Sequence, residues 1–229
     1  MDFSFLTKTI LFRGTTEKEA EEMLHCLQAF TKDYQKGEIV YRIGEQVDHL
    51  GLVLSGNVHI ENDDIWGNRN ILSHVQTGQI FAETYACIPG EPLMVNVIAA
   101  EKSQVLFLNM KRLLSTCTNS CEHHSRLIHN LLQVTAQKNL TLSRKIFHTA
   151  SKSIRGRLLS YLSEQAVQSG SKQFVIPFNR QQLADYLNVE RSALSNELSK
   201  MKADGLLDYE RNSFVLYTSF IEEDYDATT

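Results

Sequence analysis

The chain has 229 residues, an apolar fraction of 42% and a net charge of −4, which together are typical of an ordinary soluble protein and argue against a generally basic nucleic-acid binder. The first residues are too polar for a signal peptide, and no window approaches the ~18 uncharged residues that a membrane span needs. We therefore expect a cytoplasmic location and no membrane partner.

The charge is unevenly distributed along the chain. Residues 1–137 carry 11 basic and 16 acidic side chains, residues 138–217 carry 12 and 7, and the last twelve residues add a charge of −4. A basic run without an intervening acid extends from Lys138 to Arg157. This asymmetry is expected where only one domain approaches phosphate groups, although a solvated helix face would produce the same run.

The first half of the chain predicts a short helix followed by a β-rich domain. Residues 15–30 combine a threonine cap, acidic residues in the first turn and helical apolar spacing. Residues 34–109 contain seven short alternating or β-branched segments separated by Gly, Asn or Asp. Such spacing is typical of a β-sandwich or barrel.

A long helix is predicted from about Glu122 to Phe147, and a second helix from about Ser151 to Ser169. The long helix has apolar or small residues at helical spacing, which are Ile128, Leu131, Leu132, Thr135 and Leu142. Pairing with the same helix of a second subunit would bury this stripe, so we expect a homodimer, although Lys138 and Asn139 interrupt the stripe. A plain connector between domains is the alternative.

The segment from Pro177 to Tyr217 predicts two short helices joined by a tight turn. Asn179 and Gln182 form a capping pair for the first helix, and Asn188 suits the turn. A second helix begins near Glu190 and buries Leu194, Leu198 and Met201. This pattern is a helix-turn-helix, and the hairpin predicted after Gly205 would be its wing.

The polar face of the second helix indicates DNA binding. Short polar side chains let a helix enter the major groove, where Arg or Asn can read base edges and Ser or Lys can hold phosphates. An amphipathic surface helix is the alternative. The residues that we expect to contact DNA are Arg180, Arg191, Ser192, Ser195, Asn196, Ser199, Lys200 and Arg211.

The order of a β-rich domain, a long helix and a C-terminal winged helix resembles the Crp-Fnr family of bacterial transcription regulators over nearly the whole chain. The segments that carry the resemblance are "KGEIVYRIGEQVDHLGLVLSGNVHI" (36–60) and "NRQQLADYLNVERSALSNELSKMKADGLL" (179–207). The resemblance implies an α+β chain with a double-stranded β-helix (jelly-roll) sensor, dimerisation through the long helix and effector-dependent binding to a near-palindromic operator. It also implies contact with RNA polymerase if the protein is an activator.

The expected organisation has four parts. These are a cyclic-nucleotide-binding-like effector domain (1–118), a dimerisation helix (119–149), a winged-helix DNA-binding domain (150–219) and an acidic tail (220–229). The family's recognition positions align with Arg191, Ser192 and Asn196, where the cyclic-AMP-responsive branch has Arg, Glu and Arg. Only Arg191 matches, so the operator of that branch does not transfer.

The expected effector site departs further from the cyclic-nucleotide-binding pattern. Glu83 is present, but Ala82 replaces a glycine, and Leu93 and Met94 stand where the family's Arg and Ser hold the cyclic phosphate. A phosphate there would be desolvated without charge-assisted hydrogen bonds, so we expect no response to cyclic AMP. The same cavity, between the sandwich and the long helix, would accept an apolar molecule or nothing, with effector contacts from Glu83, Leu93, Met94, Val95 and Leu127.

A redox, haem or metal sensor of the same family is the alternative reading. It would use Cys117, Cys121 and His123 or His124, although their spacing is not a zinc signature and we expect no cofactor. Iron-sulfur members of the family have three cysteines near the N-terminus. No cysteine precedes Cys26 in this sequence, so we do not expect an iron-sulfur sensor.

Two other classes of protein are the alternatives to a regulator. A metal-dependent jelly-roll enzyme would need converging ligands, and His49, His59 and His74 form no such motif, so we do not expect an enzyme. A winged helix that binds protein instead of DNA is the third class.

Overall fold

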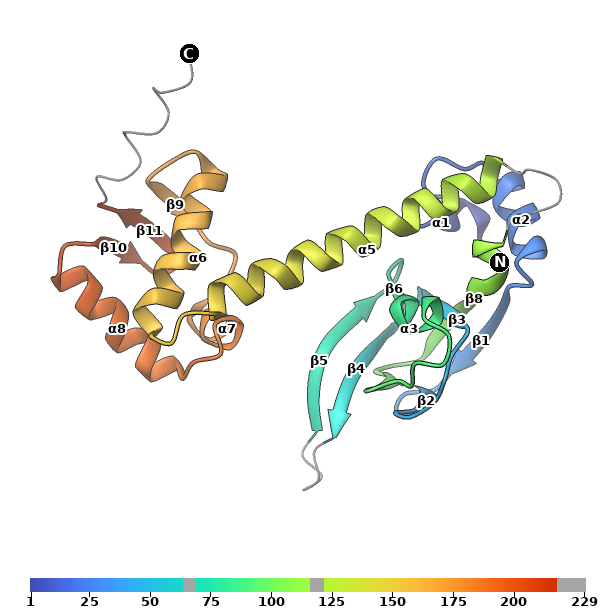
Figure 1. Ribbon diagram of the computed structural model, residues 1–229, viewed down its shortest axis with the longest axis horizontal. Helices are drawn as coiled ribbons and strands as arrows, with labels where there is room; N and C mark the ends of the chain where they lie inside the picture. Colours follow the sequence, from blue (N-terminus) through green and yellow to red (C-terminus); the bar gives the residue numbers. More distant parts are fainter. Residues whose placement is uncertain (64–68, 116–121, 218–229) are drawn as a thin grey trace, which may run out of the picture. The chain divides into compact units, whose positions relative to one another are not determined.

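The computed structural model describes residues 1–63, 69–115 and 122–217 (Figure 1). The chain divides into two compact units, Met1–Gln137 and Lys138–Thr229. The boundary lies inside the long helix α5 (Glu122–Thr149), which was predicted to end near Phe147. The first part of α5 therefore belongs to the N-terminal unit and its last part to the C-terminal unit, so the helix does not form a segment of its own.

The N-terminal unit contains two antiparallel four-stranded sheets, ordered β1-β8-β3-β6 and β2-β7-β4-β5. The strands are β1 (Phe30–Tyr34), β2 (Ile39–Tyr41), β3 (His49–Ser55), β4 (Asn57–Asp63), β5 (Arg69–Gln76), β6 (Ile80–Phe81), β7 (Asn96–Ala99) and β8 (Ser103–Asn109). Val53, Val105 and Phe107 from one sheet pack with Val58 and Val97 from the other. The predicted jelly roll is confirmed, since alternate residues of both sheets fill one core.

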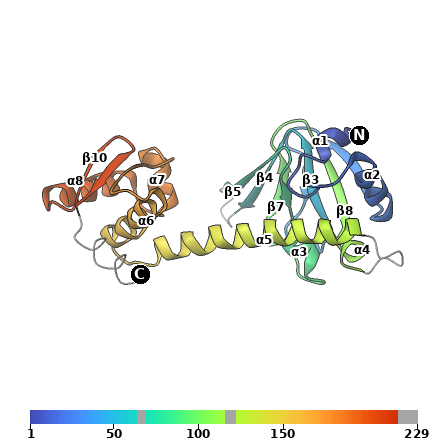
Figure 2. The same ribbon diagram turned by 90° about the horizontal axis from the view of Figure 1, so that it is seen from above.

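Helices cover the outer face of the first sheet, where Leu50, Leu52, Leu106 and Leu108 are fully buried. The covering elements are α1 (Phe3–Leu6), α2 (Glu17–Cys26), α4 (Met110–Leu114) and the start of α5. Figure 2 shows α1 and α2 beside β3 and β8.

The helix predicted over residues 15–30 is confirmed as α2, but it ends four residues earlier. Thr16 and Glu19 form the reciprocal capping box at its start. It ends at Cys26 because residues 30–34 are recruited as the edge strand β1, which pairs with β8. A tertiary pairing thus overrides the local helical pattern.

The C-terminal unit combines three helices with a three-stranded sheet of order β10-β11-β9. Its further elements are α6 (Ile154–Ser169), β9 (Gln173–Val175), α7 (Arg180–Tyr186), α8 (Arg191–Ala203), β10 (Leu207–Glu210) and β11 (Ser213–Leu216). Leu158, Leu162, Leu183, Leu198 and Phe214 belong to one buried cluster. The helix-turn-helix and its hairpin therefore share a single core with α6.

Within the described ranges, no helix is both long enough and apolar enough to cross a bilayer.

Candidate nucleic-acid interface and effector region

The turn between α7 and α8 is held by backbone geometry that the sequence predicts. Asn179 and Gln182 cap α7 reciprocally. Asn188 has a φ of 53°, a left-handed conformation that asparagine tolerates better than most residues, and Val189 N donates to Ala184 O at 3.0 Å. Glu190 is the N-cap of α8, so the recognition helix begins at Arg191.

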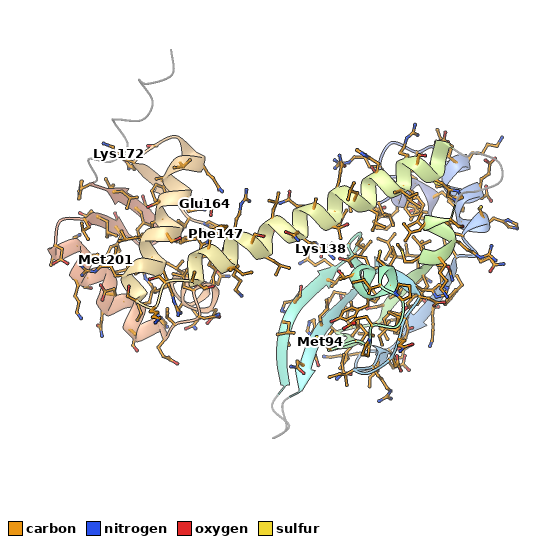
Figure 3. The ribbon with its side chains drawn as sticks, viewed as in Figure 1. Met94, Lys138, Phe147, Glu164, Lys172 and Met201 are labelled. Atoms are coloured by element: carbon orange, nitrogen blue, oxygen red, sulfur yellow. The ribbon has the colours of Figure 1, made fainter. Side chains whose placement is uncertain are left out.

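One face of α8 anchors the helix and the opposite face is available to a partner. Leu194, Leu198 and Met201 are completely buried, as predicted (Met201 is labelled in Figure 3). The exposed polar side chains are those of Arg191, Ser192, Asn196, Ser199 and Lys200, with Ser195 partly buried. The structure therefore brings six of the eight predicted DNA-contacting residues onto one helix face.

The serines of this face are engaged with their own helix. Ser195 Oγ donates to Arg191 O and Ser199 Oγ donates to Ser195 O, both at 3.0 Å. A serine bonded in this way presents a small oxygen acceptor instead of a free donor. Arg191, Asn196 and Lys200 are left as the long side chains that can donate to base edges or phosphates.

Arg180 is placed differently from the α8 residues, because its side chain braces the wing. Its guanidinium lies 4.9 Å above the Tyr209 ring and 5.8 Å from that of Phe214, and its Nη2 donates to Arg211 O at 3.2 Å. Burial lowers the pKa of Arg180. These contacts give Arg180 a structural role, and its contact with DNA stays a prediction.

Arg211 lies at the tip of the β10–β11 hairpin, as expected for a wing. It has a φ of 53° and an exposed side chain, and the flanking Glu210 and Ser213 are ladder partners. Asn212, beside it, donates from Nδ2 to Ile176 O at 3.1 Å. The tip is therefore tied to the rest of the unit while Arg211 projects from it.

Two arginines of α6 have a role that the charge pattern did not reveal. Arg155 donates from Nε to Glu197 Oε1 at 2.6 Å, and its Nη2 lies 2.7 Å from Asp204 Oδ2. These two carboxylates lie on α8 and at its C-cap, and their hydrogen bonds raise the pKa of Arg155. Arg155 thus links α6 to the middle of α8, at Glu197, and to its C-cap, at Asp204.

Arg157 holds the turn of the helix-turn-helix. Its Nη1 donates to Leu187 O at 2.9 Å and Asn188 O at 3.0 Å, and its Nε donates to Ser151 O at 2.8 Å. Gly156, between the two arginines, is required by space, because a Cβ there would lie 2.1 Å from Ser151 Oγ. Arg155 and Arg157, the last two residues of the basic run, therefore bind groups of their own unit, a use that neither reading of the run had anticipated.

A further polar cluster joins the end of α5 to α6 and α7 inside the C-terminal unit. The His148 side chain is buried, with Nε2 2.5 Å from Glu164 Oε2 and Nδ1 2.9 Å from Tyr186 Oη. Arg144 Nε lies 3.1 Å from Glu164 Oε1. Glu164, labelled in Figure 3, thus receives cationic or polar groups from α5, and the last turns of α5 are anchored to the winged helix.

The residues predicted to line the effector cavity lie in different environments. Glu83 and Leu93 are buried and Val95 is half-buried, whereas Met94 is 68% exposed (Figure 3). Leu127 is completely buried in the cluster of α1, α2 and α5, and that cluster includes none of Leu93, Met94 and Val95. A groove of about 370 Å³ in this unit is lined by other residues, among them Phe30, Tyr41 and Phe107.

The position of Ala82 departs from the residue type that its backbone favours. Ala82 has a φ of 59° at the N-cap of α3 (Glu83–Cys87), a conformation that glycine adopts without strain. Ala82 stands where the cyclic-nucleotide-binding members have a glycine, and it has the positive φ that a glycine would adopt most easily.

The alternative sensor residues are largely outside the described part. Cys117 and Cys121 lie in residues 116–121, and the side chain of His123 is also not described. His124 is buried in the N-terminal unit. Among the described residues, no group of three or more His, Cys, Asp or Glu side chains could hold a metal ion, and His59 and His74 pack edge to face with ring centroids 4.4 Å apart.

Comparison with known proteins relates both units to described families. Residues 31–120 match the cyclic nucleotide-binding domain, and residues 156–217 match the Crp-like helix-turn-helix domain. The transcriptional activator protein FnrL of Cereibacter sphaeroides is 21% identical over 212 residues, which is 88% of this chain and 82% of FnrL.

Solved structures show the same fold. The catabolite activator protein of Thermus thermophilus is 20% identical with a TM-score of 0.52, over 91% of this chain and 94% of that one. CprK in complex with OCPA is 16% identical with a TM-score of 0.58, over 86% and 92%. Both similarities extend across the sensor unit and the winged helix.

Proposed function

The chain belongs to the Crp-Fnr family of transcription regulators, and from this membership we propose that it acts as an effector-responsive homodimer on a near-palindromic operator. Its DNA-binding element is the helix-turn-helix of residues 156–217. The observation that carries the proposal is the arrangement of α8, whose apolar face is completely buried while Arg191 and Asn196 are exposed. A rigidly anchored helix with short polar residues fits the major groove.

The distribution of charge along the chain supports DNA binding by the C-terminal unit. Residues 138–217 carry an excess of five positive charges, and the rest of the chain is acidic. Phosphate contacts from Lys200 and Arg211 would supply affinity, and Arg191 and Asn196 would supply discrimination between bases. If the protein is an activator, RNA polymerase is a further partner.

The proposed homodimer pairs through α5. Its exposed apolar residues include Leu132, Leu142 and Ile146, each more than 60% exposed in the single chain. Apolar groups of this size on one helix face are stabilised by burial against an identical face. Parallel pairing brings the C-terminal ends of two α5 helices together, and each is followed by its own winged helix, as two half-sites ~34 Å apart require.

The proposed effector is a molecule without a phosphate. Support comes from Leu93 and Met94, which stand where the cyclic-nucleotide-binding members of the family have Arg and Ser. No charged partner for a cyclic phosphate is present at those two positions. Glu83 is buried at the start of α3 and, with Leu93, Met94, Val95 and Leu127, is proposed to contact an apolar effector if one is bound.

The experiment that tests this function maps DNA occupancy of the chain in the cells that produce it, so that the natural effector is present. We expect discrete sites that share a two-fold-symmetric motif. A matched variant, Arg191→Ala with Asn196→Ala, should lose these sites while remaining folded. Occupancy without any shared motif, unchanged in the variant, would instead favour a winged helix that binds protein.

A further inference from the structure

The largely exposed stripe on α5 has heptad spacing, with the carboxamide of Asn139 at its centre and Thr135 as its other polar residue. Leu132, Thr135, Asn139, Leu142 and Ile146 are separated by three, four, three and four residues, which is the spacing of alternating a and d positions. Leu132, Asn139 and Ile146 occupy a, and Thr135 and Leu142 occupy d. Asn139 therefore lies on the stripe and does not interrupt it.

The monomer leaves this stripe open to solvent. Leu132 is 65%, Leu142 63% and Ile146 67% exposed, and Asn139 is exposed between them. Asn139 Oδ1 accepts a hydrogen bond from Ser143 Oγ at 3.3 Å, so the orientation of the amide is set within the helix. One carboxamide thus lies among apolar side chains that a second helix would bury.

We propose that Asn139 selects the parallel, in-register pairing of two α5 helices by hydrogen bonding to the partner subunit's Asn139. This inference rests on the proposed homodimer and specifies its register and orientation. At an a position of a parallel pair, each residue faces its own copy, so a carboxamide donates and accepts across the interface. A slipped register would place Asn139 against leucine or isoleucine and bury its amide without a partner, which is unfavourable.

The neighbouring charges favour the same orientation. Lys138 and Lys145 occupy consecutive g positions, and the e positions between Leu132 and the end of α5 hold Ala136 and Ser143. In a parallel pair, g faces e of the other helix, so Lys138 meets the partner's neutral Ser143, and Lys145 lies opposite the end of the partner helix. In an antiparallel pair, g faces g, so lysines would approach each other, and an a residue would pack against d instead of its own copy.

A second stripe with the same spacing lies on a neighbouring face of α5 and could also pair with a second helix. Ala136, Leu140, Ser143 and Phe147 are also separated by four, three and four residues, and Leu140 and Phe147 are exposed (Phe147 is labelled in Figure 3). Apolar area alone does not distinguish strongly between the two faces. Pairing through the second stripe would leave Asn139 in solvent, so the amide sets the register and orientation within the first stripe and not the choice between the two faces.

Disulfide formation in the full-length chain tests the register. The four natural cysteines are replaced by serine, and one cysteine is introduced by Leu142→Cys or, in a second protein, by Ser143→Cys. A disulfide requires Cα atoms within ~7 Å, so position 142 links only when the first stripe pairs in parallel and in register. We expect Leu142→Cys to link nearly completely and Ser143→Cys to link poorly.

The selective role is tested by adding Asn139→Leu, with Gln137→Leu as the matched control on the same helix but off the stripe. Sedimentation equilibrium should show dimers for the parent and for the control. Asn139→Leu should tighten association about tenfold or more, because a leucine replaces a buried amide, while disulfide formation at position 142 falls and larger oligomers appear.

Each other outcome overturns a stated claim. Dimers of Asn139→Leu that still link fully at position 142 would refute selection by Asn139 and leave the homodimer standing. Preferential linkage at position 143 would refute the stripe and also leave the homodimer standing. A parent protein that stays monomeric and links at neither position would refute both the homodimer and the register.

Discussion

Arg191 and Asn196 are the residues of α8 whose chemistry best suits base recognition. The hydroxyl hydrogens of Ser195 and Ser199 are engaged with the helix backbone, so these serines keep the face small and polar. Arg191 stands at the first position of α8, where an arginine can reach a guanine with two parallel hydrogen bonds. If α8 reads bases as proposed, the identity of Arg191 and Asn196 sets the preferred bases, whereas the fold depends on the buried residues of the helix.

Replacing Arg191 with Ala should reduce discrimination between the operator and unrelated DNA by ~1–3 kcal/mol, since one bidentate base contact is lost. Competition gel shifts at a fixed salt concentration measure this ratio. Lys200→Ala is the matched control, because loss of a phosphate contact should weaken binding to all sequences alike and lower the salt dependence. Equal losses on operator and random DNA for Arg191→Ala would show that it contacts only phosphate.

Residues at positive φ show where the sequence is constrained by backbone and not by chemistry. Asn188 turns the chain between α7 and α8, and Gly205, with a φ of 72°, ends α8 so that Leu206 N can donate to Met201 O at 3.0 Å. Both were recognisable from residue type. Ala82, also at positive φ, was not, because alanine gives no such signal.

At the scale of elements, one arginine of α6 holds α8 through two carboxylates. Arg155 spans Glu197 and Asp204, seven residues apart on the recognition helix and its cap, which are two turns of an α-helix. A planar guanidinium can satisfy two carboxylates at once, whereas an ammonium acts as a point charge. Arg155 therefore fixes α8 against α6 at two points.

Arg155→Met should lower operator affinity about tenfold or more, because the recognition helix loses its fixed angle and with it base contacts worth ~1–3 kcal/mol each. Lys152→Met removes the same charge from an exposed lysine of the same segment and should change operator affinity little beyond a small electrostatic loss. Gel shifts report affinity, and thermal unfolding reports stability. Arg155→Lys should not restore binding. Equal losses for Arg155→Met and Lys152→Met would contradict a positioning role.

The extent of the long helix α5 could be predicted from the sequence, but the burial of its individual residues could not. Its extent, Glu122–Thr149, agrees with the apolar periodicity and the absence of Pro and Gly. The spacing could not show that Leu131 and Val134 are buried within the N-terminal unit while Leu132 and Leu142 stay exposed. The two sets differ only in which neighbours the tertiary fold supplies.

At the scale of the whole molecule, the N-terminal unit and the winged helix each match a domain family. The N-terminal unit departs from its family at the residues that bind the cyclic phosphate. Leu93 and Met94 replace the phosphate-binding pair, and Glu83 remains buried at the start of α3. At these two positions, the phosphate of a cyclic nucleotide would lose the charge-assisted hydrogen bonds that the family's Arg and Ser supply. The N-terminal unit thus matches the cyclic nucleotide-binding domain but has Leu93 and Met94 in place of that family's phosphate-binding Arg and Ser.

Titration of the purified protein with cyclic AMP should give no saturable heat and no shift of the thermal unfolding midpoint, since stabilisation by a ligand requires binding to the native state. Isothermal calorimetry with 5′-AMP as the matched control separates specific from general nucleotide effects. Saturable binding of cyclic AMP that 5′-AMP does not reproduce would show that other residues replace the lost arginine.

The sequence by itself determined the order of the domains, the capping of α2 and α7, the helix-turn-helix and the exposed polar face of α8. These features depend on residues close together in the chain, whose periodicity and turn chemistry act locally. Only the tertiary structure decided that Arg155, Arg157 and Arg180 brace the winged helix, that Leu127 lies in the helical core, and that β1 shortens α2. Their partners are distant in sequence, so burial and pairing were set by packing that no local pattern encodes.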